Sequence, residues 1–281
     1  MNFGVNTFLF TSPFTTESIS LFPKFKKWGF DSVEIALEDA SHIDAKAVKK
    51  ALDDNGLVCG SICAAMGPDR DLRGDETQQQ TAINYIKSVL DAMVILDCPV
   101  LIGPLYSSVG RAEPTEKEEY KKQWATVVKH LKSLAEYAAS KGRKLAIEPL
   151  NRYETDFINT SAQAVQMVND VNHDAIYVHL DSYHMNIEEK DPAKAILHAG
   201  KKLGHFHACG SDRGTPGGDQ INWQKIGAAL KEVGYDKSVV IESFTPAVKV
   251  IAKAASIWRD FEPSQEDIAE KGVKFLRSAL V

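Results

Sequence analysis

The 281-residue sequence contains no apolar run long enough to cross a membrane, which takes roughly 20 consecutive apolar residues in a helix. Its beginning, MNFGVNTFLF, lacks the basic segment and the small-residue cleavage site of a secretory signal peptide. Cysteine is scarce, and Cys59 and Cys63 are too far apart for a CxxC redox pair. We therefore expect a cytoplasmic protein with reduced cysteines, of which Cys59, Cys63 and Cys98 belong to the core.

The sequence also lacks long blocks of one charge, and its formal net charge is −5. That pattern argues against a surface for nucleic acid or for an anionic membrane, so neutral small molecules or metal cations are the expected ligands. No predicted strand is followed by a GxGxxG turn, and there is no GxxxxGK[ST] loop. The usual signatures of dinucleotide and nucleoside triphosphate sites are therefore missing.

Short β-branched runs alternate with longer amphipathic segments from one end of the chain to the other. The predicted strands are residues 3–8, 32–37, 57–64, 99–104, 144–149, 175–181, 203–208 and 237–243. The clearest predicted helices are residues 76–97, 117–142 and 222–234, and the last two end at a glycine.

Strands and helices that alternate with short connections indicate right-handed βαβ units and a parallel sheet. Eight such units in 281 residues predict an α/β fold, a (β/α)₈ TIM barrel, with residues 1–281 as a single domain. A doubly wound open sheet is the alternative, but the missing GxGxxG turn argues against it. We find no linker, repeat or low-complexity tract that would divide the chain.

The carboxyl ends of four predicted strands carry charged or ligating side chains, and active sites of such barrels lie at these ends. Strand five ends at Glu148, strand six at Asp181, strand seven near His207 and strand eight at Glu242. An oxygen-rich set with one imidazole suits Mn²⁺, Mg²⁺ or Co²⁺ better than a structural zinc site. A dication would also stabilise three carboxylates that otherwise repel one another. The alternative is four unrelated polar strand ends, such as helix caps or solvated residues.

Five further polar residues belong to the same face of the predicted barrel. His179 and His205 lie two residues before proposed ligands, one layer deeper, and we expect buried, hydrogen-bonded core histidines rather than ligands. Glu154, His184 and Arg213 follow strands five, six and seven in loops. These three are candidates for hydrogen bonds to a polyhydroxylated ligand, with solvated loop residues as the alternative.

Four segments resemble the ketose 3-epimerases, a group of xylose-isomerase-like TIM barrels that includes D-tagatose 3-epimerase and D-allulose (D-psicose) 3-epimerase. The segments are 148-EPLNRYET-155, 180-LDSYHMNIEE-189, 204-GHFHACGSDRGTPGG-218 and 241-IESF-244. The N-terminal half resembles the group only in its strand spacing. The resemblance implies a metal ion, usually Mn²⁺, held by Glu148, Asp181, His207 and Glu242. It also implies a sugar substrate and a homodimer or homotetramer.

The resemblance further implies that Glu148 and Glu242 transfer protons, while Glu154, His184 and Arg213 bind the sugar near its carbonyl end. A metal ion at O2 and O3 would stabilise a cis-enediolate. One glutamate would remove the C3 proton, and the other would return a proton to the opposite face, which inverts the carbon.

Two departures from the group concern the sugar pocket. Cys209 and Gly210 stand where a Gly-Glu pair is common, and 103-GPLYSSVG-110 lacks a tryptophan often found there. These departures leave the identity of the sugar open, and we expect Cys209 to be a small core residue rather than an exposed thiol. Free sugars are favoured over sugar phosphates, although 213-RGTPGG-218 could bind a phosphate.

Three other functions stay open at this point. They are a metal-dependent aldose–ketose isomerase of an unusual sugar, the catalytic subunit of a C-glycoside deglycosidase, and a non-catalytic module that binds sugar or metal. A binding module would have no need of two bases, which argues against the last.

Overall fold

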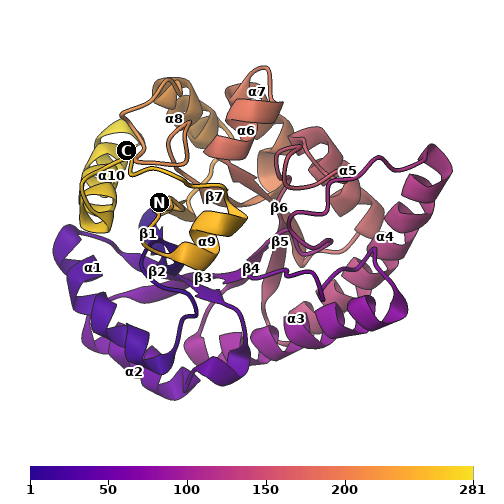
Figure 1. The fold of residues 1–281 in the computed structure, drawn as a ribbon, viewed down its shortest axis with the longest axis horizontal. Helices are drawn as coiled ribbons and strands as arrows, with labels where there is room; N and C mark the ends of the chain where they lie inside the picture. The colour runs from indigo at the N-terminus through magenta and orange to yellow at the C-terminus, as the bar shows by residue number, and fades with distance from the viewer. Residues whose placement is uncertain (281) are drawn as a thin grey trace.

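Parallel strands close into a barrel in the order β1 to β8, as the computed structural model of residues 1–280 shows (Figure 1). The strands are β1 Asn2–Asn6, β2 Ser32–Leu37, β3 Val58–Ala64, β4 Val100–Gly103, β5 Lys144–Ile147, β6 Ile176–Asp181, β7 Leu203–His207 and β8 Ser238–Ile241. The first and last strands pair with each other, with Val5 opposite Ile241, and this pairing closes the barrel. The prediction of a (β/α)₈ barrel is confirmed.

Helices connect the strands and surround the barrel (Figure 1). They are α1 Phe22–Trp28, α2 Ala45–Asp54, α3 Glu76–Leu96, α4 Lys117–Ser140, α5 Ser161–Val171, α6 Ser182–Glu188, α7 Pro192–Ala199, α8 Trp223–Glu232, α9 Lys249–Ala254 and α10 Gln265–Leu280. Short 3₁₀ turns are η1 Thr7–Leu9, η2 Thr16–Leu21, η3 Ala40–His42 and η4 Gly200–Lys202. The three helices predicted most clearly are confirmed, with ends that differ by one or two residues.

Local side-chain chemistry sets several of these boundaries. The carboxylate of Asp75 accepts a hydrogen bond from the Gln78 backbone, and the Gln78 side chain accepts one from the Asp75 backbone, so that a capping box begins α3. The first strand ends earlier than predicted, because the Asn6 side chain accepts from the Phe8 backbone N–H and turns the chain into η1.

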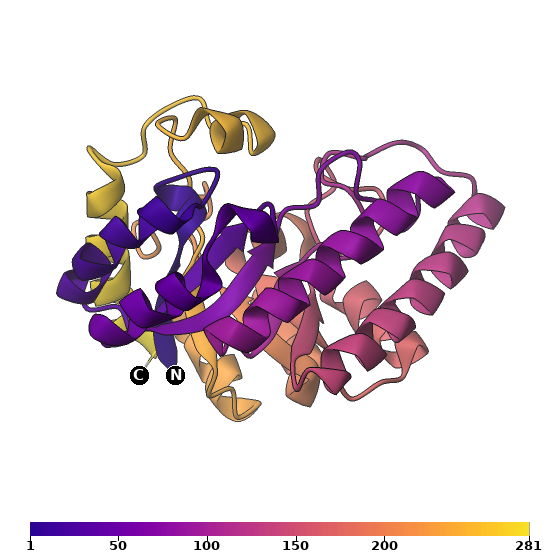
Figure 2. The same cartoon turned by 90° about the horizontal axis from the view of Figure 1, so that it is seen from below.

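The segment between β8 and α10, residues 242–264, crosses the carboxyl end of the barrel. In Figure 1 its helix α9 lies in front of the strands, and in Figure 2, turned by 90°, it lies beyond one end of them. Phe244 and Ile257 of this segment pack in one apolar cluster with Ala36, Cys63 and Ile102 of the strands. We refer to residues 242–264 as the cover, because they lie over the end of the barrel at which the strands end.

Two further predictions concern the cysteines and membrane-spanning segments. All four cysteines are buried and free, as the sequence predicts for its core cysteines. Within residues 1–280, none of the helices combines the length and the apolar character that a membrane crossing needs.

Candidate active site

Side chains from four consecutive strands meet at the carboxyl end of the barrel. Asp181 and His207 are the last residues of β6 and β7, and Glu148 and Glu242 directly follow β5 and β8. Nδ1 of His207 lies 3.2 Å from Oε2 of Glu242 and 3.8 Å from Oδ2 of Asp181. The same nitrogen lies 4.0 Å from Oε1 of Glu148. One ligand atom of each residue is within 4.8 Å of the others, so the fold gathers the four side chains predicted as ligands.

The chemistry of these facing atoms fits a divalent cation. Oε1 of Glu148, Oδ2 of Asp181 and Nδ1 of His207 are buried and have no hydrogen-bond partner within residues 1–280. Burying an unpaired polar atom costs free energy, so such atoms usually have a partner. A dication with ligand bonds of about 2.0–2.2 Å holds its ligand atoms roughly 3–4 Å apart, and would satisfy all three. The four residues could therefore hold a metal ion.

Electrostatic effects within the cluster differ from one carboxyl group to the next. Burial, and then the negative charge of Glu242, raise the pKa of Glu148 well above its usual range. Burial also raises the pKa of Asp181 to about 6, although Arg213 opposes the shift. For Glu242, burial is outweighed by His207 and Arg213, and its pKa is lowered. Glu148 therefore needs a nearby positive charge to remain a carboxylate at neutral pH, whereas Asp181 is still mostly ionised there.

Glu34, in the middle of β2, is a charged residue that the sequence analysis missed. It is fully buried, and its Oε1 accepts from Nε2 of His207 at 2.7 Å and from Nδ2 of Asn6 at 2.8 Å. Its Oε2 accepts from the Ser61 hydroxyl and lies 2.8 Å from Nε2 of His205. Burial opposes ionisation, but the two histidines outweigh it and hold the pKa of Glu34 well below its usual range.

A signal for Glu34 was present in the sequence. In 32-SVEIAL-37 the polar or small residues Ser32, Glu34 and Ala36 alternate with large apolar ones, so a strand places them on one face. That face points into the barrel, where Glu34 contacts His207.

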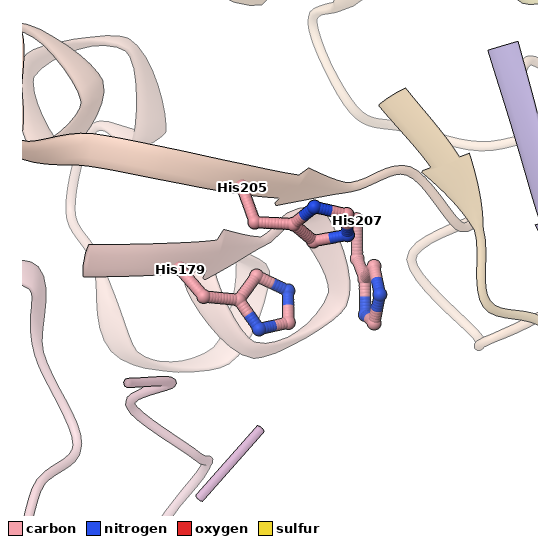
Figure 3. A group of neighbouring side chains, drawn as sticks. All are labelled: His179, His205 and His207. Carbon is pink, nitrogen blue, oxygen red and sulfur yellow. The ribbon is translucent and has the colours of Figure 1, made fainter. Parts of the chain in front are cut away.

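His179, His205 and His207 form a layer of imidazoles on β6 and β7 (Figure 3). Their ring centroids lie 4.1–5.0 Å apart, in edge-to-face arrangements. All three are buried, as expected for His179 and His205, but neither nitrogen of His179 has a hydrogen-bond partner within the described chain. The predicted hydrogen bonding of His179 is therefore wrong, and Nε2 of His205 likewise has no hydrogen-bond partner within the described chain, although it lies near Glu34. Nδ1 of His179 lies 3.5 Å from Oε2 of Glu148.

The three residues predicted to contact a ligand also come together. Arg213 Nη1 lies 3.4 Å from Oε1 of Glu154 and 3.3 Å from Nε2 of His184, and Nη2 lies 3.0 Å from Oε2 of Glu242. The guanidinium stacks between the rings of Tyr183 and Phe244, 4.7 and 4.6 Å from their centroids. Arg213 is only 5% exposed, so it is a buried cation beside the candidate metal site rather than a solvated loop residue.

The position of His184 differs from the prediction in one respect. The sequence placed it in a loop, whereas it lies on helix α6, which begins directly after β6. Asp181 caps this helix by accepting from the Tyr183 backbone N–H at 2.7 Å, so the residue that ends the strand also starts the helix. The backbone of His184 is therefore helical and not part of a loop. Its Nδ1 accepts a hydrogen bond from the Asn151 backbone N–H at 3.0 Å.

The two departures from the ketose 3-epimerase pattern lie close to this site. Cys209 is buried, and its thiol lies 3.3 Å from Oδ1 of Asp181, as expected for a small core residue and not for an exposed thiol. In the loop after β4, the hydroxyl of the buried Tyr106 donates to the backbone oxygen of Glu148 at 2.7 Å. Both residues therefore support the backbone or side chain of a candidate ligand.

Comparisons of the sequence and of the structure with known proteins agree on one family. The family model described as a xylose isomerase-like TIM barrel matches residues 22–279. A probable ketose 3-epimerase of Synechocystis sp. is 35% identical over 280 residues, which cover 99% of this chain and 96% of that protein. A D-psicose 3-epimerase of Agrobacterium fabrum is 32% identical over 245 residues, covering 84% and 83%. The crystal structure of a Methylomonas sp. D-allulose 3-epimerase in complex with D-allulose superposes with a TM-score of 0.92 at 27% identity, covering 99% and 97%.

The chain belongs to the xylose isomerase-like TIM barrel family. Its homologues include ketose 3-epimerases, which are isomerases, so the resemblance to this group is confirmed.

Proposed function

We propose that this protein is a metal-dependent epimerase of free ketoses that inverts C3, with a substrate of the D-tagatose, D-fructose/D-allulose or L-ribulose type. The observation that carries the proposal is the meeting of Glu148 and Glu242 in one buried cluster with Asp181 and His207. Relatives named D-psicose 3-epimerase and L-ribulose 3-epimerase support the substrate class.

Glu148, Asp181, His207 and Glu242 would hold the metal ion, for which we propose Mn²⁺, with Mg²⁺ or Co²⁺ as alternatives. Support comes from three carboxylates and one imidazole whose facing atoms include three without a hydrogen bond in the described chain. When bound, a dication supplies positive charge beside the sugar carbonyl and so lowers the barrier to loss of the adjacent proton.

Glu148 and Glu242 would exchange protons with the two faces of C3. They follow β5 and β8, which β6 and β7 separate around the barrel, so the two carboxyl groups approach a bound sugar from different sides. One group, as a carboxylate, removes the C3 proton, and the other, as a carboxylic acid, donates a proton to the opposite face of the enediolate.

Arg213, Glu154 and His184 would bind the sugar near its carbonyl end. The guanidinium already contacts both of the other side chains and Glu242, so a sugar oxygen bound by Arg213 would lie beside a proton-transfer group. Charge that develops on that oxygen during proton removal would be stabilised by the fixed N–H groups of arginine.

An enzyme of the same chemistry with a different outcome is the principal alternative. An aldose–ketose isomerase would move the proton between C1 and C2, a C-glycoside deglycosidase subunit would eliminate an aglycone from a 3-keto sugar, and a binding module would do neither. The pair of proton-transfer groups is the feature that argues against a module.

Deuterium exchange separates these possibilities. Mn²⁺-loaded protein would be incubated in D₂O with D-fructose, D-tagatose and L-ribulose, and the products analysed by NMR. We expect deuterium at C3 together with the C3 epimer, and loss of both after the metal is removed with a chelator. Exchange at C1 instead of C3 would indicate an isomerase, and no exchange with any ketose would contradict the proposed function.

We also propose a cytoplasmic homodimer or homotetramer. Four buried free thiols suit a reducing compartment. On the cover, Trp258 and Val250 are 73% and 67% exposed, and a second subunit would shield them. Light scattering coupled to size-exclusion chromatography would measure the oligomeric state, and a monomer at micromolar concentration would contradict the proposal.

A further inference from the structure

The carboxylate of Glu34 lies directly behind the candidate metal site, at the centre of a hydrogen-bond network. Ser61, Asn6 and His207 donate to its two oxygens, and Nε2 of His205 lies 2.8 Å from Oε2. Three hydrogen bonds thus converge on one side chain that is itself fully buried, and Nε2 of His205 lies close to it without forming a fourth. A carboxylate suits this position because it only accepts hydrogen bonds and offers about four lone-pair sites.

We propose that Glu34 is a positioning residue for the metal site, because it fixes His207 with the proton on Nε2 and the lone pair of Nδ1 directed at the three carboxylates. The inference rests on the proposed function in so far as that function includes a metal ion. It assigns a role to a strand residue that lies outside the four proposed metal ligands and the three proposed sugar-binding residues.

The two nitrogens of His207 have different surroundings. Nε2 is 2.7 Å from Oε1 of Glu34, whereas Nδ1 has no hydrogen-bond partner within residues 1–280 and faces Glu242, Asp181 and Glu148. An imidazole that gives its N–H to a carboxylate presents the other nitrogen as a lone pair in a fixed direction. The carboxylate also makes that nitrogen more basic, and so a stronger ligand.

The contact between His207 and Glu34 also bears on the role of the three histidines shown in Figure 3. His179, His205 and His207 could in principle hold an ion by themselves. However, Nε2 of His205 and Nε2 of His207 both face Glu34, and the rings pack edge to face at centroid distances down to 4.1 Å. We therefore interpret these histidines as the support of the carboxylate cluster rather than as a second metal site.

Glu34 reaches a second member of the cluster through Asn6. Nδ2 of Asn6 donates to Oε1 of Glu34 at 2.8 Å and lies 3.3 Å from Oε1 of Glu242. The amide thus ties one candidate proton-transfer group to the same buried carboxylate that holds His207. A change at Glu34 should accordingly disturb metal binding first and the alignment of Glu242 as well.

Metal affinity tests the inference directly. Mn²⁺ binding would be measured by titration calorimetry on metal-free wild-type protein and on Glu34→Gln, whose amide has one acceptor oxygen and turns an NH₂ group toward the surrounding donors. We expect binding about 10–100-fold weaker in Glu34→Gln, as for other partners of metal-bound histidines. Glu38→Gln is the matched control, since the Glu38 side chain accepts from the Ser12 hydroxyl and the Phe14 backbone N–H rather than from a candidate ligand, and this variant should bind Mn²⁺ as the wild type does.

A merely structural role would lower the melting temperature of the metal-free protein without changing affinity in the folded variant. Folded Glu34→Gln with wild-type Mn²⁺ affinity would therefore overturn the inference while leaving the proposed function intact. A wild-type protein that binds no Mn²⁺, Mg²⁺ or Co²⁺ would overturn both. At saturating Mn²⁺, we expect Glu34→Gln to keep a near-normal KM and a reduced kcat, because Asn6 then no longer fixes Glu242.

A second measurement needs no variant, and so does not depend on whether Glu34→Gln folds. In wild-type protein labelled with ¹⁵N and loaded with diamagnetic Mg²⁺, His207 should carry its proton on Nε2, and that proton should exchange slowly with water because it is buried against Glu34. A proton on Nδ1, or an Nε2 proton in free exchange, would overturn the assignment.

Discussion

Nη2 of Arg213 lies 3.0 Å from Oε2 of Glu242, and both side chains are almost fully buried. The same oxygen is 3.2 Å from Nδ1 of His207, so one carboxylate oxygen is shared between the candidate metal ligands and the candidate sugar-binding group. A buried ion pair requires good geometry, because desolvation of both charges is costly. Stacking of the guanidinium between two aromatic rings and its contacts with Glu154 and His184 provide that geometry.

Replacement of Arg213 by lysine should impair catalysis and not only binding. Lysine keeps the positive charge but loses the planar fork that reaches Glu242 and the sugar together. If arginine stabilises charge on the substrate oxygen, kcat and kcat/KM should both fall, whereas loss of ground-state binding alone would raise KM and leave kcat unchanged. We expect the first result in steady-state kinetics on the best ketose substrate.

Arg259→Lys is the control for this experiment, since Arg259 is exposed on the cover and pairs loosely with Asp212 at 3.7 Å. It should leave both parameters unchanged. Wild-type kinetics in Arg213→Lys would mean that the loop carrying Cys209 and Gly210 does not direct Arg213 to the substrate.

Glu148→Gln and Glu242→Gln should each reduce kcat by about 10²–10⁴-fold, because an amide neither accepts nor donates the transferred proton and general acid–base groups contribute this much. Both should also weaken metal binding, since an uncharged amide oxygen is a poorer ligand for a hard dication. The assay is epimer formation at saturating Mn²⁺. A residual kcat above about a tenth of the wild-type value in either variant would exclude the two-base scheme, and the exposed Glu113→Gln serves as the unaffected control.

The variants Asp181→Asn and His207→Ala should bind the metal ion less well than the wild type. Elemental analysis of the purified proteins would measure their metal content directly. The expected result is a clearly substoichiometric metal content in both variants. Asp174→Asn is the matched control, because Asp174 is exposed and precedes β6, at the opposite end of the strand from Asp181, and should leave the metal content unchanged. Stoichiometric metal in Asp181→Asn and His207→Ala would show that the ion is held elsewhere.

Much of the barrel could be predicted from the sequence, because its strands are buried on both faces and therefore appear as short apolar runs. The four candidate ligands could be predicted for the same reason, as they stand where those runs stop and so meet at one end of the barrel. Glu34 could not be assigned a role in this way. Its partners Asn6, Ser61 and His207 lie on β1, β3 and β7, and only the closure of the barrel brings β7 to face β2 across its interior.

Helix α6 escaped prediction for a different reason. It contains only residues Ser182–Glu188, too few for an apolar periodicity, and depends on Asp181 as its cap. The sequence could equally suggest an isolated metal ligand followed by a loop. The structure shows Oδ1 of Asp181 bonded to the Tyr183 backbone and Oδ2 left facing the cluster, so that one side chain caps the helix and could also hold a metal ion.

Asp156 should stabilise the loops around the site through a partly buried bidentate pair with Arg73. Nη1 and Nη2 of Arg73 lie 2.7 and 3.0 Å from the two oxygens of Asp156, and the Thr115 hydroxyl donates to Asp156 at 2.8 Å. The arginine side chain is 1% exposed, so Asp156→Asn would leave a buried cation without its anion. We expect a loss on the order of 3 kcal/mol in the free energy of unfolding, measured by urea titration. Asp91→Asn removes an exposed ion pair with Lys141 and should cost less than about 1 kcal/mol.

The same pair predicts a pH dependence with a definite sign. Burial raises the pKa of Asp156, but the hydrogen bonds from Arg73 and Thr115 outweigh it, and the net pKa is lowered. A carboxyl group whose pKa is lower in the folded state stabilises the protein above its unfolded-state pKa of about 3.9, and this contribution is lost as the pH falls toward the folded-state value. Urea midpoints measured from pH 7 down to pH 3 should therefore fall less steeply for Asp156→Asn than for the wild type. Parallel curves, or a loss at pH 7 no greater than that of Asp91→Asn, would contradict a stabilising role for the pair.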